Sequence, residues 1–239
     1  WSEIDMLPKL VTPKYDMIVP STGESITYRP YVVREEKILL IAMESQDEKQ
    51  IENAVMNVIE SCVETPLDIN SLTTFDVEFI FVTLRSKSVG EGIKLGPSCV
   101  HCEEENEIKV NLDEVTITNL GKAVDRHIKL TDDISLDLKW TTMKDRKGEL
   151  QSDSETETII NLMIASIETI YSGEETFDLR DSPREEIKDF IESLSTDQFE
   201  QIVNVLAKAP YLSYNVNYNC KKCNKENSIE LKGLTDFFQ

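Results

Sequence analysis

The chain has 239 residues and a formal net charge of −20, from 45 acidic and 25 basic side chains. It is long enough to bury a hydrophobic core in one large domain or two smaller ones. This acidity disfavours binding to nucleic acids and anionic membranes, because both attract positive protein surfaces. The sequence contains no signal peptide and no apolar run near the roughly 20 residues of a membrane-spanning helix. We therefore expect a protein partner.

The first third of the chain predicts a β-hairpin and three helices. The expected elements are extended runs at 14–19 and 24–28 around a turn at 20–23, then helices at 34–44, 47–63 and 75–87. Pro66 follows the second helix and stops it. The third segment is rich in β-forming Phe, Ile and Val and could also form a strand. Its length and the potential N-caps Thr73 and Thr74 favour a helix.

The rest of the chain predicts β-structure followed by helices. The expected elements are a β-rich stretch at 107–140 with hairpin strands at 128–130 and 134–140, a polar loop or hinge at 141–154, and helices at 155–172, 183–193 and 196–208. Gly173 is expected to end the first of these helices, Ser182 and Pro183 to open the second, and Thr196 to cap the third. The acidic run at 152–157 fits a helix N-terminus, where carboxylates meet the helix dipole favourably.

Two short segments of the chain are copies of one another. Residues 99–108, the first knuckle, and 220–229, the second knuckle, share two cysteines, a Glu, an Asn and an Ile at the same offsets. A Zn2+ site built from four thiolates needs two such Cys-x-x-Cys turns, because each turn places two sulfurs on one side. We predict one Zn2+ held by Cys99, Cys102, Cys220 and Cys223. The 117 residues at 103–219 greatly exceed the usual gap of about 15–20 residues between such pairs, so the repeat carries this prediction.

Extended runs flank both knuckles, as in the two halves of a zinc ribbon. They lie at 108–112, 211–218 and 229–231. Four thiolates leave no open coordination position, which is typical of a structural zinc, and unpaired cysteines fit a reducing cytosol. Two independent redox motifs, or reduced cysteines without metal, are the alternatives, but neither explains the matching Glu, Asn and Ile. We expect His101 to be an exposed turn residue and Cys62 a buried residue of a helix.

The sequence lacks the motifs of common enzymes. It has two histidines, His101 and His127, and no GxSxG, Walker A, GxGxxG or HExxH pattern. Close pairs among 45 carboxylates are unavoidable, so they do not indicate a glycosidase. We therefore predict no catalytic activity and no catalytic residues.

Basic residues gather in the N-terminal part of this acidic chain. They are Arg29, Arg34, Lys37, Arg85 and Lys87. They are too few for a nucleic-acid groove, and each could pair locally with an acid such as Glu35 or Glu36. Their concentration still makes this region a candidate contact surface.

Five segments, together with the two knuckles, resemble a known family. The segments are 7–10, 19–23, 28–31, 34–45 and 84–90. They resemble the baseplate hub assembly proteins of T-even-type contractile-tailed bacteriophages, most densely over 7–112 and again over 211–239. The resemblance implies a tail protein without enzymatic activity, which helps to build the central hub of the baseplate through protein contacts. Its expected locations are the host cytoplasm during assembly and the virion tail baseplate, and the residues leave open whether it stays in the finished particle.

The combined expectation is a zinc-stapled α+β protein that binds other phage baseplate hub or tail subunits. Its expected parts are a hairpin and helical region at 1–95, the first knuckle with a β region at 96–142, an acidic linker and helical region at 143–210, and the second knuckle, which closes the ribbon, at 211–239. The residues expected to contact the partner are Tyr28, Arg29, Pro30, Arg34, Arg85 and Lys87. Two other classes are the alternatives. An acidic transcription-associated zinc ribbon would need a basic face, which the acids at 103–105 oppose, and a tail-associated hydrolase would need a catalytic cleft or an open zinc site.

Overall fold

The computed structural model describes residues 10–146, 154–179, 182–233 and 236. Its architecture is mixed α+β, as predicted. The helices are α1 (Val33–Ser45), α2 (Glu48–Cys62), α3 (Thr74–Val89), α4 (Met143–Arg146), α5 (Glu155–Ser166), α6 (Arg184–Glu192) and α7 (Thr196–Leu206), with short 3-10 helices at Ile69–Ser71 and Leu112–Glu114. The strands are β1 (Tyr15–Ile18), β2 (Ser25–Tyr28), β3 (Gly92–Leu95), β4 (Ile108–Asn111), β5 (Thr116–Thr118), β6 (His127–Lys129), β7 (Ile134–Leu138), β8 (Ile167–Ser172), β9 (Glu175–Asp178), β10 (Tyr211–Asn219) and β11 (Glu226–Lys232). Within the described ranges, no helix has both the length and the apolar character to cross a bilayer.

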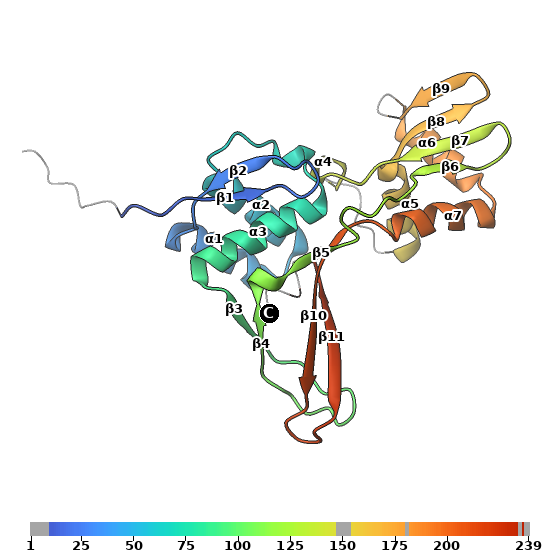
Figure 1. Cartoon of the computed structure of the whole chain (residues 1–239). Helices are drawn as coiled ribbons and strands as arrows, with labels where there is room; N and C mark the ends of the chain where they lie inside the picture. Colours follow the sequence, from blue (N-terminus) through green and yellow to red (C-terminus); the bar gives the residue numbers. More distant parts are fainter. Residues whose placement is uncertain (1–9, 147–153, 180–181, 234–235, 237–239) are drawn as a thin grey trace, which may run out of the picture.

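The first core lies between the N-terminal hairpin and helices α1, α2 and α3 (Figure 1). β1 and β2 pair antiparallel, which confirms the predicted hairpin. The helical hypothesis for 75–87 is also confirmed, because α3 begins directly after Thr73. The buried Asp76 side chain accepts hydrogen bonds from the N–H of Thr73 at 3.1 Å and of Ser21 at 2.9 Å. One carboxylate therefore caps α3 and holds the hairpin turn against it.

The second core joins α3 to the ribbon that carries the knuckles. β3 pairs with β4, and β10 pairs with β11 on one side and β5 on the other, all antiparallel. Apolar side chains from α3 and from all five strands fill the core; they include Val82, Ile93, Val110, Ile117, Leu212 and Leu231. Figure 1 shows that the loop between β3 and β4 meets the tip of the β10–β11 hairpin at the end of the ribbon far from the helices.

The third core lies between a four-stranded antiparallel sheet and three helices. The strand order is β6-β7-β8-β9, and α5, α6 and α7 pack against this sheet (Figure 1). The predicted hairpin at 128–130 and 134–140 is the β6–β7 pair, with Ile128 opposite Leu136. The helices predicted at 183–193 and 196–208 are α6 and α7.

The prediction of one helix at 155–172 is wrong in its second half. α5 ends at Ser166, and the chain continues directly into β8. Ile167 and Ile170 are three residues apart, which is helical spacing, but a β-bulge in the pairing with β7 lets both face the core. Gly173 does not end a helix: with a φ of 60° it forms the turn from β8 to β9.

Two further predictions differ from the structure: the N-cap of α7 and the loop at 141–154. Ser195, not Thr196, is the N-cap of α7, because the Ser195 side chain accepts from the N–H of Gln198 while the Gln198 side chain accepts from the N–H of Ser195. The predicted loop at 141–154 contains the short helix α4, and residues 147–153 lie outside the described part of the chain. The predicted acidic helix start at 152–157 contains the beginning of α5.

Candidate metal centre

The four knuckle sulfurs lie together at the end of the ribbon. The Cys99 and Cys223 sulfurs are 3.7 Å apart, as are those of Cys102 and Cys220, and all four lie within 4.8 Å of one another. These distances are far longer than the roughly 2.05 Å of a disulfide bond. A tetrahedron with Zn–S bonds of roughly 2.3 Å has edges of about 3.8 Å. The sulfurs therefore have the spacing of a four-thiolate site and could hold one metal ion.

The backbone makes the same hydrogen bonds in both knuckles. The first cysteine of each donates its N–H to the carbonyl five residues later, and its own carbonyl accepts from the N–H four residues later; all four bonds are 2.9 Å long. The N–H two residues after that cysteine points at its sulfur at 3.4 Å in both copies. The repeated sequence therefore produces a repeated conformation, with backbone donors aimed at sulfur.

These donors and the crowding of the sulfurs separate the thiol pKa values. The N–H groups of Cys223 and Lys222 lower the pKa of Cys220 to about 6. The N–H of Glu104 also lowers the pKa of Cys102, but desolvation and the neighbouring sulfurs outweigh it and raise that pKa to about 12. Against desolvation, the N–H groups of His101 and Cys102 lower the pKa of Cys99 as well, so deprotonation is favoured at the first cysteine of each knuckle. Since thiolates are the ligand form, a divalent cation would favour deprotonation of the whole set.

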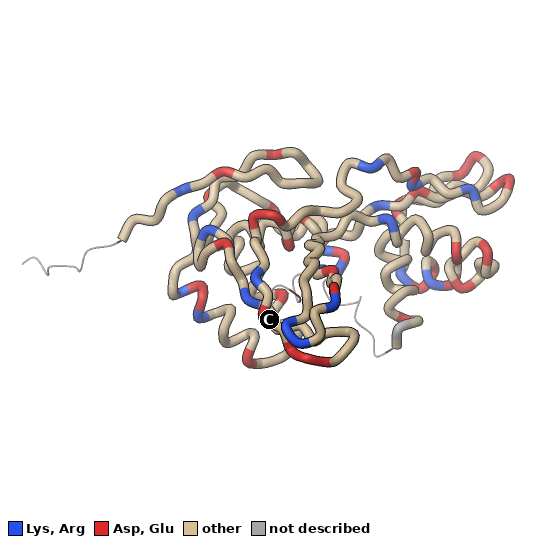
Figure 2. The backbone as a smooth tube through the Cα atoms, turned by 60° about the horizontal axis from the view of Figure 1, so that its bottom comes forward, with Lys and Arg blue, Asp and Glu red and all other residues tan. Residues whose placement is uncertain are grey.

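An ion-pair bridge connects the outer surfaces of the knuckles. The Glu104 carboxylate lies 3.2 Å from Lys222 Nζ and 3.4 Å from Lys221 Nζ. Hydrogen bonds from these two ammonium groups lower the pKa of Glu104. Figure 2 shows basic and acidic stretches of chain side by side where the knuckles meet. Glu104 thus neutralises part of the positive charge of the second knuckle.

Two repeated asparagines, which the sequence analysis did not assign to the site, connect the knuckles internally. Asn106 Oδ1 accepts from the N–H of Lys221 at 2.9 Å, and Asn227 Oδ1 accepts from the N–H of Val100 at 3.1 Å. The signal for both was their recurrence at the same offset in the two copies. Geometry was needed to show that each one bonds to the other copy.

The expectations for His101 and Cys62 are confirmed. His101 is an exposed turn residue, and it is not part of the four-cysteine cluster. Cys62 is 0% exposed, at the end of α2 in the first core. Desolvation raises the pKa of its thiol to about 11, which fits an unreactive core residue.

The residues predicted to contact a partner do not all lie on the surface. Tyr28 is 2% exposed and Pro30 is buried. Arg29 lies 3.0 Å from Glu35 and donates to the Ser61 carbonyl at 2.9 Å, so it joins the hairpin to α1 and α2. The local pairing considered for the arginines is therefore confirmed for this residue.

The other three basic residues differ in exposure. The Arg34 side chain is 75% exposed, although its Nη2 lies 2.7 Å from the same Glu35 carboxylate. Lys87 is 30% exposed and lies 3.1 Å from Asp113. Arg85 is half-buried on α3. A contact surface in this region would therefore be centred on Arg34 rather than on the hairpin.

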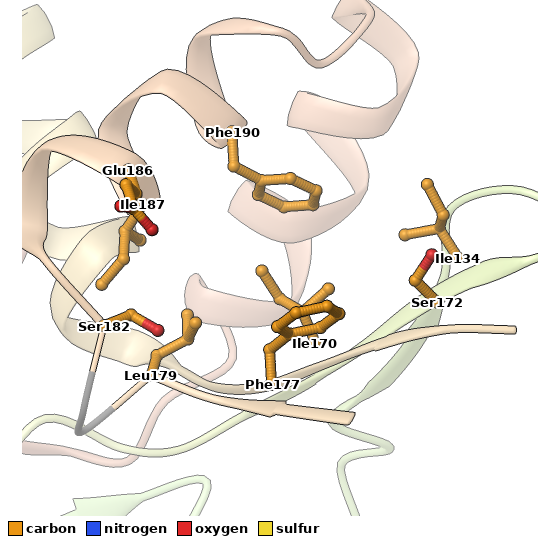
Figure 3. Close-up of a pocket in the computed structure, with 9 residues that line it drawn as sticks. All are labelled: Ile134, Ile170, Ser172, Phe177, Leu179, Ser182, Glu186, Ile187 and Phe190. Carbon is orange, nitrogen blue, oxygen red and sulfur yellow. The ribbon is translucent and has the colours of Figure 1, made fainter. Parts of the chain in front are cut away.

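A cleft of about 270 Å³ opens between the four-stranded sheet β6-β7-β8-β9 and α6 (Figure 3). The rings of Phe177 and Phe190 lie across it from one another, and Ile170 and Ile187 add to its apolar lining. Among the described residues that line it, Glu186 is the one acidic or basic side chain. A single carboxylate by itself offers neither an acid–base pair nor a nucleophile with its base, so the described part of this lining gives no support to a hydrolase.

Comparison with known proteins agrees with the resemblance found in the sequence. The family model described as "T4 bacteriophage base plate protein" matches residues 12–239. The chain is also 23% identical to the baseplate hub assembly protein gp26 of Enterobacteria phage T4, over 231 residues that cover 95% of this chain and 97% of that protein. No solved structure matches. Because the match spans nearly the whole chain, the protein belongs to the family of T4 bacteriophage base plate proteins.

Proposed function

We propose that this protein takes part in assembly of the phage baseplate hub by binding other hub or tail subunits, and that one structural Zn2+ staples its ribbon. The likeness to a baseplate hub assembly protein over 95% of the chain supports the role. The observation that carries the binding mode is an exposed apolar face on α1. The protein acts in the host cytoplasm during assembly and is located at the tail baseplate.

The outward face of α1 carries exposed apolar side chains beside the exposed charged residues Lys37 and Glu44. Val33, Leu40 and Ile41 are 77%, 54% and 56% exposed. Leu40 and Ile41 follow Val33 by seven and eight residues, which is about two turns, so all three share one side of the helix. The opposite side, with Leu39 and Ala42, is buried in the first core. Large apolar side chains that gather in this way on one exposed helix face are typical of protein contact sites.

The end of α3 extends this face. The N–H of Tyr31 donates to Ser88 Oγ at 2.9 Å, which brings the start of α1 beside the end of α3. Val89, at that end, is 58% exposed, and the exposed guanidinium of Arg34 lies at the start of α1. We define Val33, Arg34, Leu40, Ile41 and Val89 as the docking patch. It replaces the buried Tyr28 and Pro30 in the expected contact surface.

The zinc part of the proposal is supported by the sulfur spacing. A closed four-thiolate site is structural, and such sites contribute to folding directly. It would hold the β3–β4 loop against the β10–β11 hairpin, two segments that are distant in sequence. With no open coordination position, it supplies no catalysis, and assembly is promoted by binding energy.

Co-purification with the hub subunits of the same phage tests the docking patch. Leu40→Ser and Ile41→Ser together should lower the affinity for the partner at least tenfold, because central apolar contacts dominate binding. Ile159→Ser is the matched control: it is 40% exposed on α5, remote from the patch, and should bind as the wild type does. Equal binding by all three proteins would show that the interface lies elsewhere.

Purified protein tests the absence of activity. Peptidoglycan, nucleotides and peptides should remain intact when incubated with it. Degradation that one His or carboxylate substitution abolished, without unfolding the protein, would overturn the proposal in favour of the hydrolase.

A further inference from the structure

We propose that Asn106 and Asn227 are positioning residues of the metal centre, and that each holds the opposite knuckle at the separation that the four sulfurs require. The inference rests on the proposed zinc site. It goes further by assigning a task to two residues outside the ligand set.

The two amide groups make equivalent bonds across the ribbon. The oxygen of Asn106 accepts from the N–H of Lys221, and the oxygen of Asn227 accepts from the N–H of Val100, at 2.9 and 3.1 Å. Each of these N–H groups belongs to the residue directly after the first cysteine of the other knuckle. A displacement of either amide would therefore shift a cysteine of the opposite knuckle.

Each amide nitrogen is bound within its own knuckle. Asn106 Nδ2 donates to the Glu104 carbonyl at 2.8 Å, and Asn227 Nδ2 donates to the Lys225 carbonyl at 2.9 Å. Those same carbonyls accept the N–H of the first cysteine of each knuckle. Each of these two asparagines thus connects a cysteine of its own knuckle to a cysteine of the other knuckle.

Burial makes these bonds difficult to replace. Asn106 and Asn227 are 5% and 2% exposed, and a buried amide that loses its partners is costly because water cannot reach it. Two other polar contacts join these segments at the surface: the ion pairs of Glu104 with Lys221 and Lys222, and a 3.3 Å hydrogen bond from the Tyr218 hydroxyl to the Ser98 carbonyl. Exposed contacts of this kind stabilise little. The asparagines are therefore the buried polar contacts that set the spacing of the knuckles, and they do so before metal binds.

Zinc affinity measured on the full chain tests the inference. Asn106→Ala and Asn227→Ala should each weaken Zn2+ binding by about 10- to 100-fold, the range typical of groups that orient metal ligands. Asn217→Ala is the matched control: Asn217 is exposed on β10 of the same hairpin, and its loss should change the affinity less than twofold. Competition with a chromogenic chelator measures affinity, and elemental analysis measures stoichiometry.

Amide hydrogen exchange of the metal-free protein gives a second readout that general destabilisation would not reproduce. Asn227→Ala should release the N–H of Val100 and Asn106→Ala that of Lys221, while the β10–β11 ladder stays protected. Asn106→Ser and Asn227→Ser keep a polar side chain that is too short to reach the opposite N–H, so they should release the same groups, and they serve if an alanine variant does not fold.

The outcomes separate the two proposals. A wild-type chain that binds no zinc would overturn the zinc site itself. A wild-type chain that binds zinc, with both asparagine variants matching Asn217→Ala in affinity, would overturn the positioning role alone. Loss of protection throughout β10 and β11 in the variants would also overturn it, because the asparagines would then only stabilise the ribbon.

Discussion

The two knuckles have the same backbone and opposite surface charge. Their turns are closed by hydrogen bonds of the same length, 2.9 Å, and their asparagines exchange equivalent contacts. The first knuckle has acidic side chains and the second basic ones at the positions that differ: Glu103, Glu104 and Glu107 against Lys221, Lys222 and Lys225. The shared cysteines and asparagines place the sulfurs, whereas these charged residues reach the surface. Placing the four sulfurs and shaping a surface are thus separate tasks of one motif.

Removing a cysteine should break the equivalence of the knuckles with the largest effect. Cys99→Ser and Cys220→Ser should each abolish zinc binding and destabilise the ribbon to the same extent, by several kcal/mol out of the roughly 10 kcal/mol that a structural zinc supplies. Elemental analysis and urea denaturation measure the two quantities. Cys62→Ser, in the first core, should keep its zinc and lose stability only through packing. Zinc retained by one of the two knuckle variants would show that the knuckles are not equivalent.

The buried Glu35 can be compared with Glu104, because each of these carboxylates bridges two basic side chains. Glu35 is 1% exposed, and although desolvation opposes its ionisation, Arg29, the N–H of Val32 and Arg34 lower its pKa to about 2. Glu35→Gln should therefore lower the free energy of unfolding at neutral pH by about 3 kcal/mol. A carboxylate whose pKa is lowered by folding contributes fully to the free energy of unfolding when the pH is above its ordinary pKa. This contribution is lost as the pH falls through the pKa of the folded state.

Urea denaturation at several pH values checks this prediction. The difference between wild type and Glu35→Gln should be constant above about pH 5 and should shrink between about pH 4.5 and 2. A difference that does not depend on pH across this range would contradict the ionised bridge.

Exchanging the residues in the left-handed conformation should produce a smaller effect. Glu103 and Asn224 occupy equivalent turn positions with φ of 59° and 54°. Asn tolerates this region better than Glu, so Glu103→Asn should stabilise the protein by about 0.5 to 1 kcal/mol and Asn224→Glu should destabilise it by a similar amount. Both side chains are exposed, so thermal unfolding reports on backbone strain. Changes of the same sign would contradict the equivalence of the two turns.

Neutralising the exposed bridge should produce the smallest effect. Glu104→Gln should reduce stability slightly in low salt, and the difference should disappear in high salt because exposed ion pairs are screened. The lowered pKa of Glu104 means that this contribution exists above the ordinary carboxylate pKa and is lost as the pH falls through the lowered one. Glu105→Gln, next to it, should show neither dependence. A salt-independent loss would indicate that Glu104 acts through the turn and not through charge.

The sequence by itself determined the features that depend on local pattern. The hairpin at β1–β2, helices α1 to α3 and the β6–β7 hairpin follow from turns, caps and apolar spacing within a few residues. The cysteine set followed from a repeat, which overcame the abnormal 117-residue gap. The family resemblance was also present in short segments and holds over 12–239.

Only the tertiary structure decided the features that depend on distant partners. β8 has apolar residues at helical spacing, Ile167 and Ile170, and only the bulge in its pairing with β7 lets both face the core from a strand. Tyr28 and Pro30 were expected to contact a partner, but both are buried, Tyr28 in the first core. The asparagines bond across more than a hundred residues of chain. Local spacing records the conformation of a segment, whereas burial and reciprocal hydrogen bonds depend on which distant segment packs against it.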